Sequence, residues 1–384
     1  MTAVVPRTVE GRDPSTGDVL RVHVAGDLVE RIERPGRSHA DLPWLVPGLV
    51  DLQVNGFAGL DVNAEQPSAD HLHRITAALR DRGVTTWVPT VITGSEDQIT
   101  ARLSAIAEAR RDPDTAAAIP FAHVEGPFIS DQDGPRGVHD RAHIRPIDAA
   151  EVQRWAQHGP VGYLTVSPHT ASASDQVAAI VRGGIAVALG HTHATTQQLQ
   201  GAVDAGATLS THLGNGIFAT LARHPNPIWT QLADDRLTCG LIGDGHHLPA
   251  ETFTAMVRAL GPGRAFLVSD AVELAGSAPG RYRTPVGGEV ELSPDGRLSY
   301  VGTDLLAGAA VSLADCVVWA LANTPFSLAE VIDLAATTPG RVVADLTGGT
   351  IRPGRLQPGG RADLCLLDDR GGVVDVVAGG RRAP

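Results

Sequence analysis

The chain has 384 residues, of which 43% are hydrophobic and 19% are charged, a composition typical of a folded globular protein and not of a disordered or fibrous one. Its formal net charge of −12 at pH 7 excludes a sequence-independent nucleic-acid binder, because such a protein needs a basic face that releases counterions. All 31 basic residues are arginines, and the absence of lysine excludes Schiff-base chemistry, a P-loop lysine and a metal site bridged by a carboxylated lysine.

Short strand-like stretches broken by glycine, proline and aspartate occupy both ends of the chain. Near the N-terminus they include residues 19–34 (VLRVHVAGDLVERIER), and near the C-terminus residues 354–368 (GRLQPGGRADLCLLD) and 371–380 (GGVVDVVAGG). Neither end suffices for a core of its own. We therefore expect residues 1–46 and 350–384 to pair into one small β-sandwich.

Between these ends, over residues 47–349, apolar β-branched runs alternate with segments of helical periodicity such as 68–83, 95–111 and 249–261. Strands that are apolar throughout, each followed by a helix, indicate a parallel sheet, and eight such units close into a (β/α)8 barrel. The competing topology is an open doubly wound sheet. The sequence speaks against it, because no G-x-G-x-x-G motif follows the first predicted strand. The predicted strands are residues 49–54, 85–91, 119–126, 163–168, 185–191, 208–213, 237–245 and 265–271.

One more segment, residues 284–301 (TPVGGEVELSPDGRLSYV), follows the eighth strand. Its central Pro294-Asp295-Gly296 favours a hairpin turn. The predicted fold is thus of the α/β class. A TIM-like barrel of the metal-dependent hydrolase type carries this β-hairpin insertion and lies beside the small β-sandwich.

Polar side chains stand where the predicted strands end, and in such barrels these ends form the active site. Ionisable residues there are hard to explain by packing, because a buried charge is costly unless it is paired or bound to a metal ion. We expect them to converge on one site. They are Gln53, Asn55, Glu125, His169, His191, His212, Asp244, His246, His247 and Asp270.

Glu125, His191 and His212 supply one carboxylate and two imidazoles, a common ligand set for a catalytic zinc ion that keeps a position open for water. Zinc lowers the pKa of that water toward about 7, and Asp270 would take its proton and later deliver it to a leaving amine. Iron(II) or manganese(II) suits the same ligands. Each histidine alone could equally hold a core or surface position, so the prediction depends on the whole set.

The chain also contains seven motifs in the order and with the spacing of one known family: PGLVDLQVNG, HVEGPF, RGVH, LGHTHAT, STHLGNGI, CGLIGDGHH and LVSDA. Together they resemble the N-acetylglucosamine-6-phosphate deacetylases of the amidohydrolase superfamily over nearly the whole chain. The resemblance implies a barrel flanked by a β-sandwich, usually a homodimer. It also implies an enzyme of amino-sugar catabolism that converts N-acetyl-D-glucosamine 6-phosphate into acetate and D-glucosamine 6-phosphate.

The resemblance implies the same metal ligands as above and Asp270 as general base, then acid. His139 would polarise the acetamide carbonyl together with the metal. His247 and Arg223 match the phosphate-binding pair of the family, with the arginine reaching across from the partner subunit, and such a pair suits a phosphate dianion. Further substrate contacts fall on Val138, Asn215, Gly216, Leu306, Ala307 and Gly308.

Gln53 and Asn55 stand where related two-metal hydrolases carry His-x-His. Neutral amides are poor ligands for a transition-metal ion beside imidazole and carboxylate, so we predict one divalent metal ion per subunit. Gln53 would instead hydrogen-bond the metal-bound water or orient Asp270.

The chain departs from the family at His169, Gly214, Gly216 and Ala309-Ala310, where Glu, Tyr, Ala and Ser-Ser are frequent. None of these is a metal ligand, so the chemistry is expected to be intact while the sugar stays open. The alternatives are N-acetylgalactosamine 6-phosphate or another acylated amino sugar, with or without the phosphate. A catalytically silent sugar-phosphate sensor is a further alternative, against which the retained ligands and Asp270 argue.

Cys239, Cys316 and Cys365 lack C-x-x-C spacing, which indicates buried thiols in a reducing compartment and no thiolate zinc site. The first residues lack a signal-peptide profile, and no apolar run approaches the ~20 residues that a spanning helix needs. We expect a cytoplasmic protein without membrane or nucleic-acid partners.

Overall fold

The structure is a computed structural model that describes residues 8–37, 41–284, 288–303 and 305–383. Its centre is an eight-stranded sheet in which all neighbouring strands run parallel. All eight predicted strands are present, and they follow sequence order around the sheet. They are β5 (Leu49–Val54), β8 (Val84–Ile92), β9 (Ala122–Glu125), β10 (Val161–Val166), β11 (Ala186–Leu189), β12 (Leu209–Ser210), β13 (Thr238–Ile242) and β14 (Ala265–Val268).

The first and last strands of this sheet, β5 and β14, meet at their C-terminal ends. The backbone N–H of Asp270 donates to the backbone carbonyl of Gln53 at 3.0 Å, and the backbone N–H of Asn55 donates to the backbone carbonyl of Ala271 at 2.8 Å. These bonds bring the sheet round into a nearly closed barrel, which confirms the predicted fold. They also place the side chains that follow β5 next to those that follow β14.

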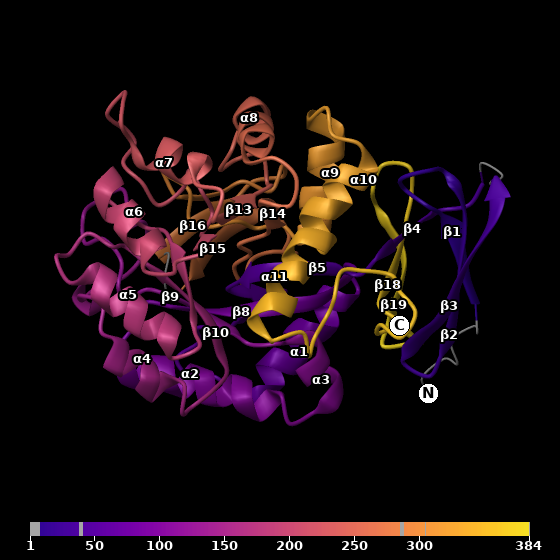
Figure 1. Ribbon diagram of the computed structural model, residues 1–384, viewed down its shortest axis with the longest axis horizontal. Helices are drawn as coiled ribbons and strands as arrows, with labels where there is room; N and C mark the ends of the chain where they lie inside the picture. The colour runs from indigo at the N-terminus through magenta and orange to yellow at the C-terminus, as the bar shows by residue number, and fades with distance from the viewer. Residues whose placement is uncertain (1–7, 38–40, 285–287, 304, 384) are drawn as a thin grey trace.

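Helices cover the outside of the barrel (Figure 1). Each strand is buried on both faces, because side chains fill the barrel on one side and helices pack on the other. Leu49 and Trp87 belong to one buried cluster, whereas Val50 and Val88 belong to a second, as expected from alternating side-chain directions. The helices are α1 (Ala69–Arg80), α2 (Glu96–Ala109), α3 (Pro113–Ala118), α4 (Ala149–Trp155), α5 (Ala173–Arg182), α6 (Thr196–Asp204), α7 (Pro227–Ala233), α8 (Ala250–Leu260), α9 (Leu313–Asn323), α10 (Leu328–Ile332) and α11 (Thr338–Leu346), with a 3-10 turn at Arg141–His143 and a π-helical turn at Asp333–Thr337.

The two ends of the chain form one seven-stranded sheet beside the barrel, seen on the right of Figure 1. Its order is β20 (Arg381–Arg382), β19 (Val373–Ala378), β18 (Leu364–Leu367), β4 (Trp44–Pro47), β1 (Thr8–Arg12), β2 (Asp18–Ala25) and β3 (Leu28–Arg37). The antiparallel pair of β4 and β18 joins the termini, as predicted. The sheet curls until Val29 on β3 exchanges backbone hydrogen bonds with Gly359 and Gly360, so that Val22, Val29 and Leu364 share a core. The domain boundaries at residues 46 and 350 stay a prediction.

A three-stranded antiparallel sheet occupies the position of the predicted hairpin. It consists of β15 (Gly280–Thr284), β16 (Gly288–Leu292) and β17 (Leu298–Tyr300). The Gly296 amide donates to the Ser293 carbonyl at 3.0 Å in the predicted turn, while residues 285–287 of the predicted hairpin lie outside the described residues. A two-stranded sheet, β6 (Gly56–Phe57) and β7 (Leu60–Asp61), follows β5.

The structure also bears on the predictions made for the cysteines and for membrane-spanning segments. Cys239, Cys316 and Cys365 are buried and form no disulfide, as predicted. Within the described ranges, none of the helices combines the length and apolar character needed to traverse a lipid bilayer.

The barrel closure gives a first testable prediction. Burial raises the pKa of Asp51 to about 7, even though the carboxylate accepts hydrogen bonds from Ser269 and Gln53. A carboxyl group with a raised pKa stabilises the fold below about pH 4 and loses this contribution as the pH rises through about 7. Asp51→Asn keeps an oxygen acceptor without the charge. The Tm of this variant should therefore gain on that of wild type between about pH 4 and pH 8, as measured by thermal unfolding. A difference in Tm that does not change with pH would contradict this.

Candidate active site

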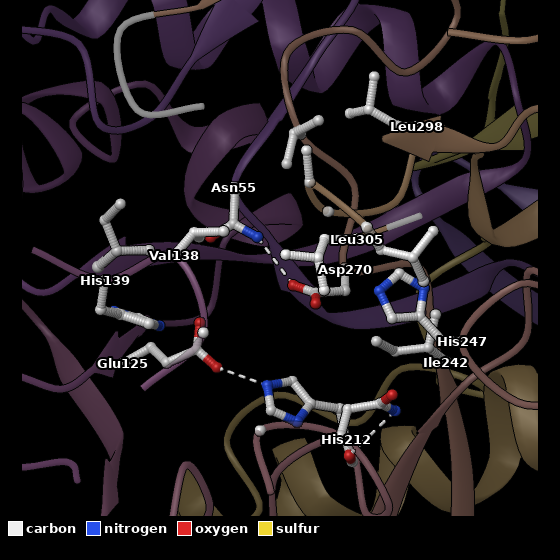
Figure 2. Close-up of a pocket in the computed structure, with 18 of the residues that line it drawn as sticks. Asn55, Glu125, Val138, His139, His212, Ile242, His247, Asp270, Leu298 and Leu305 are labelled. Carbon is white, nitrogen blue, oxygen red and sulfur yellow. Dashed lines mark hydrogen bonds and ion pairs between the residues drawn. The ribbon is translucent and has the colours of Figure 1, made fainter. Parts of the chain in front are cut away.

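A cavity of about 350 Å³ lies at the C-terminal ends of the barrel strands. Figure 2 shows its side chains, with Glu125, His139 and His212 on one side and Asp270, His247 and Leu305 on another. The predicted site residues that line it are Asn55, Glu125, Val138, His139, His191, His212, Asn215, Gly216, His247, Asp270, Leu306, Ala307 and Gly308. The structure thus brings together most of the side chains that sequence reasoning selected.

Three of these side chains form a tight cluster. Glu125 Oε1 lies 3.0 Å from His212 Nε2 and 3.4 Å from His191 Nε2, and the two Nε2 atoms are 3.1 Å apart. Tetrahedral ligands with metal–ligand bonds near 2.1 Å stand about 3.4 Å from one another. His191 Nδ1 lies 2.8 Å from the Pro135 carbonyl, a contact that fixes the Nδ1–H tautomer and leaves Nε2 as a ligand atom. The cluster has the spacing and the chemistry of a metal site.

His139 stands beside this cluster. Its ring meets the ring of His191 edge to face at 4.5 Å, and ligand atoms of Glu125, His139 and His191 lie within 4.8 Å of one another. Nδ1 lies 2.9 Å from Thr93 Oγ1, which leaves Nε2 to face the cavity. Burial lowers the pKa of His139 to about 3, so this ring is neutral near pH 7.

The backbone turns sharply where these side chains leave their strands. His191, His212 and Asp270 each follow a strand end by two residues, and their φ angles are 47°, 27° and 51°. Non-glycine residues rarely adopt this left-handed conformation, and such strain concentrates at functional sites. Gly216 has a φ of +57°, and a Cβ atom there would lie 2.9 Å from Nδ1 of His191, so this glycine leaves room for the ring.

The two buried carboxyl groups of the cavity have shifted pKa values. Burial alone would raise the pKa of Glu125, but the hydrogen bonds and charges of His191 and His212 bring it well below its usual value. Burial and the nearby charge of Glu125 raise the pKa of Asp270 to about 6. A carboxyl group with a pKa near the working pH can both accept and deliver a proton.

The two amides of the first strand support these carboxylates. Gln53 Nε2 donates to Glu125 Oε1 at 3.0 Å, and Asn55 Nδ2 donates to Asp270 Oδ1 at 2.8 Å, the latter drawn as a dashed line in Figure 2. Of the two roles predicted for the Gln53 side chain, the structure shows its hydrogen bond on Glu125 and not on Asp270, while a bond to metal-bound water stays a prediction. Side chains two residues apart along a strand point to the same side, so both amides face the same side of the barrel, where Gln53 meets Glu125 and Asn55 meets Asp270.

Other selected residues lie outside the cavity lining. Arg223 is exposed on the segment that precedes α7. His169 Nδ1 lies 2.8 Å from Ser167 Oγ, and its ring packs against that of His193. His246 Nε2 lies 3.1 Å from the Asp295 carbonyl at the turn of the inserted sheet.

The cavity also has walls that the motifs did not indicate. Val290, Leu298 and Tyr300 of the inserted sheet line it, together with Leu305. The alternation of apolar residues in β16 and β17 was the available signal, because it gives the sheet an apolar face. Three polar residues also contribute to the lining: Asp61, Asn63 and Glu273. Glu273 could have been expected there, because it follows the strand-end residue Asp270 by only three positions.

Comparisons with known proteins agree with this geometry. No family model matches the chain. Human N-acetylglucosamine-6-phosphate deacetylase is 32% identical over 337 residues, which cover 85% of this chain and 80% of the human protein. The chain belongs to the N-acetylglucosamine-6-phosphate deacetylase family. It is therefore a hydrolase of the amidohydrolase type, as the sequence motifs predicted.

Further relatives include both sugar specificities. An N-acetylgalactosamine-6-phosphate deacetylase from Shewanella sp. (strain ANA-3) is 31% identical over 339 residues, or 86% of this chain and 81% of the relative. A structure of the Mycobacterium smegmatis N-acetyl-D-glucosamine-6-phosphate deacetylase, in complex with N-acetyl-D-glucosamine-6-phosphate, matches with a TM-score of 0.83 and 27% identity, covering 98% of this chain and 97% of that one. The Thermotoga maritima enzyme matches with a TM-score of 0.82 and 25% identity, covering 99% of each chain.

The bond from Gln53 to Glu125 gives a second prediction. Partners that orient a ligand typically change metal affinity by about 10- to 100-fold when they are removed, so Gln53→Leu should weaken zinc binding by this amount. Competition with a chromophoric chelator measures the affinity. Gln231→Leu is the matched control, because Gln231 is also buried but bonds to Ser210. Equal zinc affinity in Gln53→Leu and wild type would show that the bond does not support the metal site.

Proposed function

We propose that the protein removes acetate from N-acetyl-D-glucosamine 6-phosphate and releases D-glucosamine 6-phosphate. The observation that carries the proposal is the cluster of Glu125, His191 and His212, whose ligand atoms stand 3.0 to 3.4 Å apart in the same cavity as Asp270. The named activities of the human and Mycobacterium smegmatis relatives support it. These three residues would hold one divalent metal ion, with zinc as the first candidate and iron(II) or manganese(II) as alternatives.

In this mechanism a bound metal ion supplies Lewis acidity that activates water and polarises the acetamide carbonyl. Asp270, whose pKa is raised to about 6, takes the proton of the attacking water and later delivers it to the leaving amine. Asn55 occupies Oδ1 of Asp270, so Oδ2 is the oxygen that exchanges the proton. His139 presents Nε2 to the substrate carbonyl and stabilises the negative charge that develops there.

The phosphate would be held by His247 and by Arg223 of the partner subunit. Within one chain Arg223 lies outside the cavity lining, which is consistent with a contact to substrate made from a second copy. Phe218 and Trp229 flank this arginine along the chain, with 39% and 55% of their surface exposed. Large aromatic side chains are enriched at protein interfaces, which supports a homodimer that forms here.

A second candidate is the same reaction on N-acetylgalactosamine 6-phosphate. The relative from Shewanella favours it, because its identity to this chain matches that of the glucosamine enzymes. Of the positions that depart from the family, only Gly216 lines the cavity, whereas His169, Gly214 and Ala309-Ala310 do not. Gly214 has a φ of +94°, and a Cβ atom there would lie 3.0 Å from Cε of Met256, so the backbone favours glycine at this position. Nothing in the structure explains the departures at His169 and Ala309-Ala310. The three buried free thiols fit a reducing compartment, and we propose the cytoplasm.

The chemistry is tested by acetate release. Purified protein with one equivalent of zinc should release acetate from either phosphorylated sugar, and kcat/KM for the two sugars identifies the substrate. Chelation should abolish the activity and added zinc should restore it. Asp270→Asn should lower kcat by about 10²- to 10⁴-fold, because it removes the general base. If zinc, iron(II) and manganese(II) all fail to support turnover, the proposed deacetylase activity is refuted and a catalytically silent sugar-phosphate sensor is favoured.

The shared site is tested by complementation. Arg223→Ala and Asp270→Asn are each expected to be poorly active alone. If Arg223 acts across the interface, a mixed dimer contains one intact site, so mixing the two variants should restore up to about one quarter of wild-type activity after random subunit exchange. Activity that stays at the sum of the separate variants, with exchange verified by mass spectrometry, would place Arg223 in its own subunit.

A further inference from the structure

One buried carboxylate near the cavity has no part in the mechanism above. Asp244 follows β13 by two residues, and only 3% of its side chain is exposed. Its Oδ1 accepts the backbone N–H groups of His246 and His247, both at 2.9 Å, and its Oδ2 lies 2.6 Å from His247 Nδ1. Burial raises the pKa of Asp244, but the hydrogen bonds and charge of His247 outweigh it, and the net pKa is lowered. The carboxylate is therefore ionised and directed at His247.

The turn around Asp244 sends two adjacent histidines in different directions. His247 lines the cavity and lies beside Asp270 in Figure 2, whereas His246 contacts the Asp295 carbonyl and does not line the cavity. Gly245 between them has a φ of +75°, and a Cβ atom there would lie 2.2 Å from Nε1 of Trp319. Glycine is therefore needed at this position. In the turn that it permits, Nδ1 of His247 meets Asp244 and Nε2 is left for the cavity.

This arrangement determines what His247 can donate. Because Nδ1 faces a carboxylate, it carries a hydrogen. A phosphate oxygen at Nε2 also needs a donor, and only the doubly protonated ring donates from both nitrogens. Hydrogen bonds between charged partners are roughly twice as strong as neutral ones.

We propose that Asp244 is a positioning residue that holds the His247 ring as an imidazolium for the 6-phosphate of the substrate. The inference rests on the proposed function. It makes Asp244 a determinant of the preference for phosphorylated over unphosphorylated sugar, although Asp244 itself does not reach the substrate.

The decisive variant is Asp244→Asn. The amide oxygen keeps the two backbone hydrogen bonds, while the amide nitrogen faces Nδ1 and leaves the ring neutral. We expect KM for the phosphorylated sugar to rise by about tenfold, with a much smaller change in kcat. KM for the unphosphorylated sugar should not change, and inorganic phosphate should become a weaker competitive inhibitor. His246→Asn is the matched control from the same turn and should behave as wild type.

A double-mutant cycle keeps the proposal testable if Asp244→Asn is less stable. If Asp244 acts through His247, adding Asp244→Asn to His247→Asn should raise KM no further. Additive effects would overturn the proposal, as would an equal loss of kcat on both sugars in Asp244→Asn. A wild-type enzyme that deacetylates both sugars with equal kcat/KM and does not bind inorganic phosphate would refute the phosphate part of the proposed function itself. Because this test uses only the wild-type enzyme, it distinguishes a failure of the proposed function from a failure of the role proposed for Asp244.

Discussion

The site depends on the hydrogen bonds that join the end of β5 to the end of β14. They close the barrel, and they bring Gln53 and Asn55 beside two acids that lie far away in sequence, Glu125 and Asp270. Without this closure the amides would face water and the two carboxylates would lose a donor each. The Gln-x-Asn segment therefore fixes the orientation of two buried carboxylates, those of Glu125 and Asp270, where the barrel closes.

Much of the fold and site was predictable because both follow from local patterns. Apolar β-branched runs give strands buried on both faces, and the ends of parallel barrel strands meet at one edge, so Glu125, His191, His212 and Asp270 could be grouped from sequence alone. The partner of Gln53 could not, because it depends on the register between β5 and β9. The left-handed backbone of the three strand-end residues was also not predictable, because histidine and aspartate, although enriched at positive φ, adopt it in only a small minority of cases.

Two buried carboxylates in and near the cavity have imidazole partners although the chain is acidic overall. Glu125 lies between two imidazoles, and Asp244 lies against His247. A net charge of −12 would repel an anionic substrate at long range, but salt screens exposed charges beyond about 8 Å while buried pairs are screened much less. A nearby imidazole such as that of His247, which lines the cavity, can therefore outweigh the overall charge at short range.

The inserted sheet has a small core of its own, formed by Leu274, Val290, Leu292, Leu298 and Ala310. It lines the cavity from outside the barrel, and its packing is separate from the cluster that supports the metal ligands. Residues that line the cavity from this sheet, such as Val290 and Leu298, can therefore change without disturbing the packing of the barrel strands. Such a division lets the wall of the cavity vary while the barrel strands stay the same, and relatives of similar identity carry two sugar specificities.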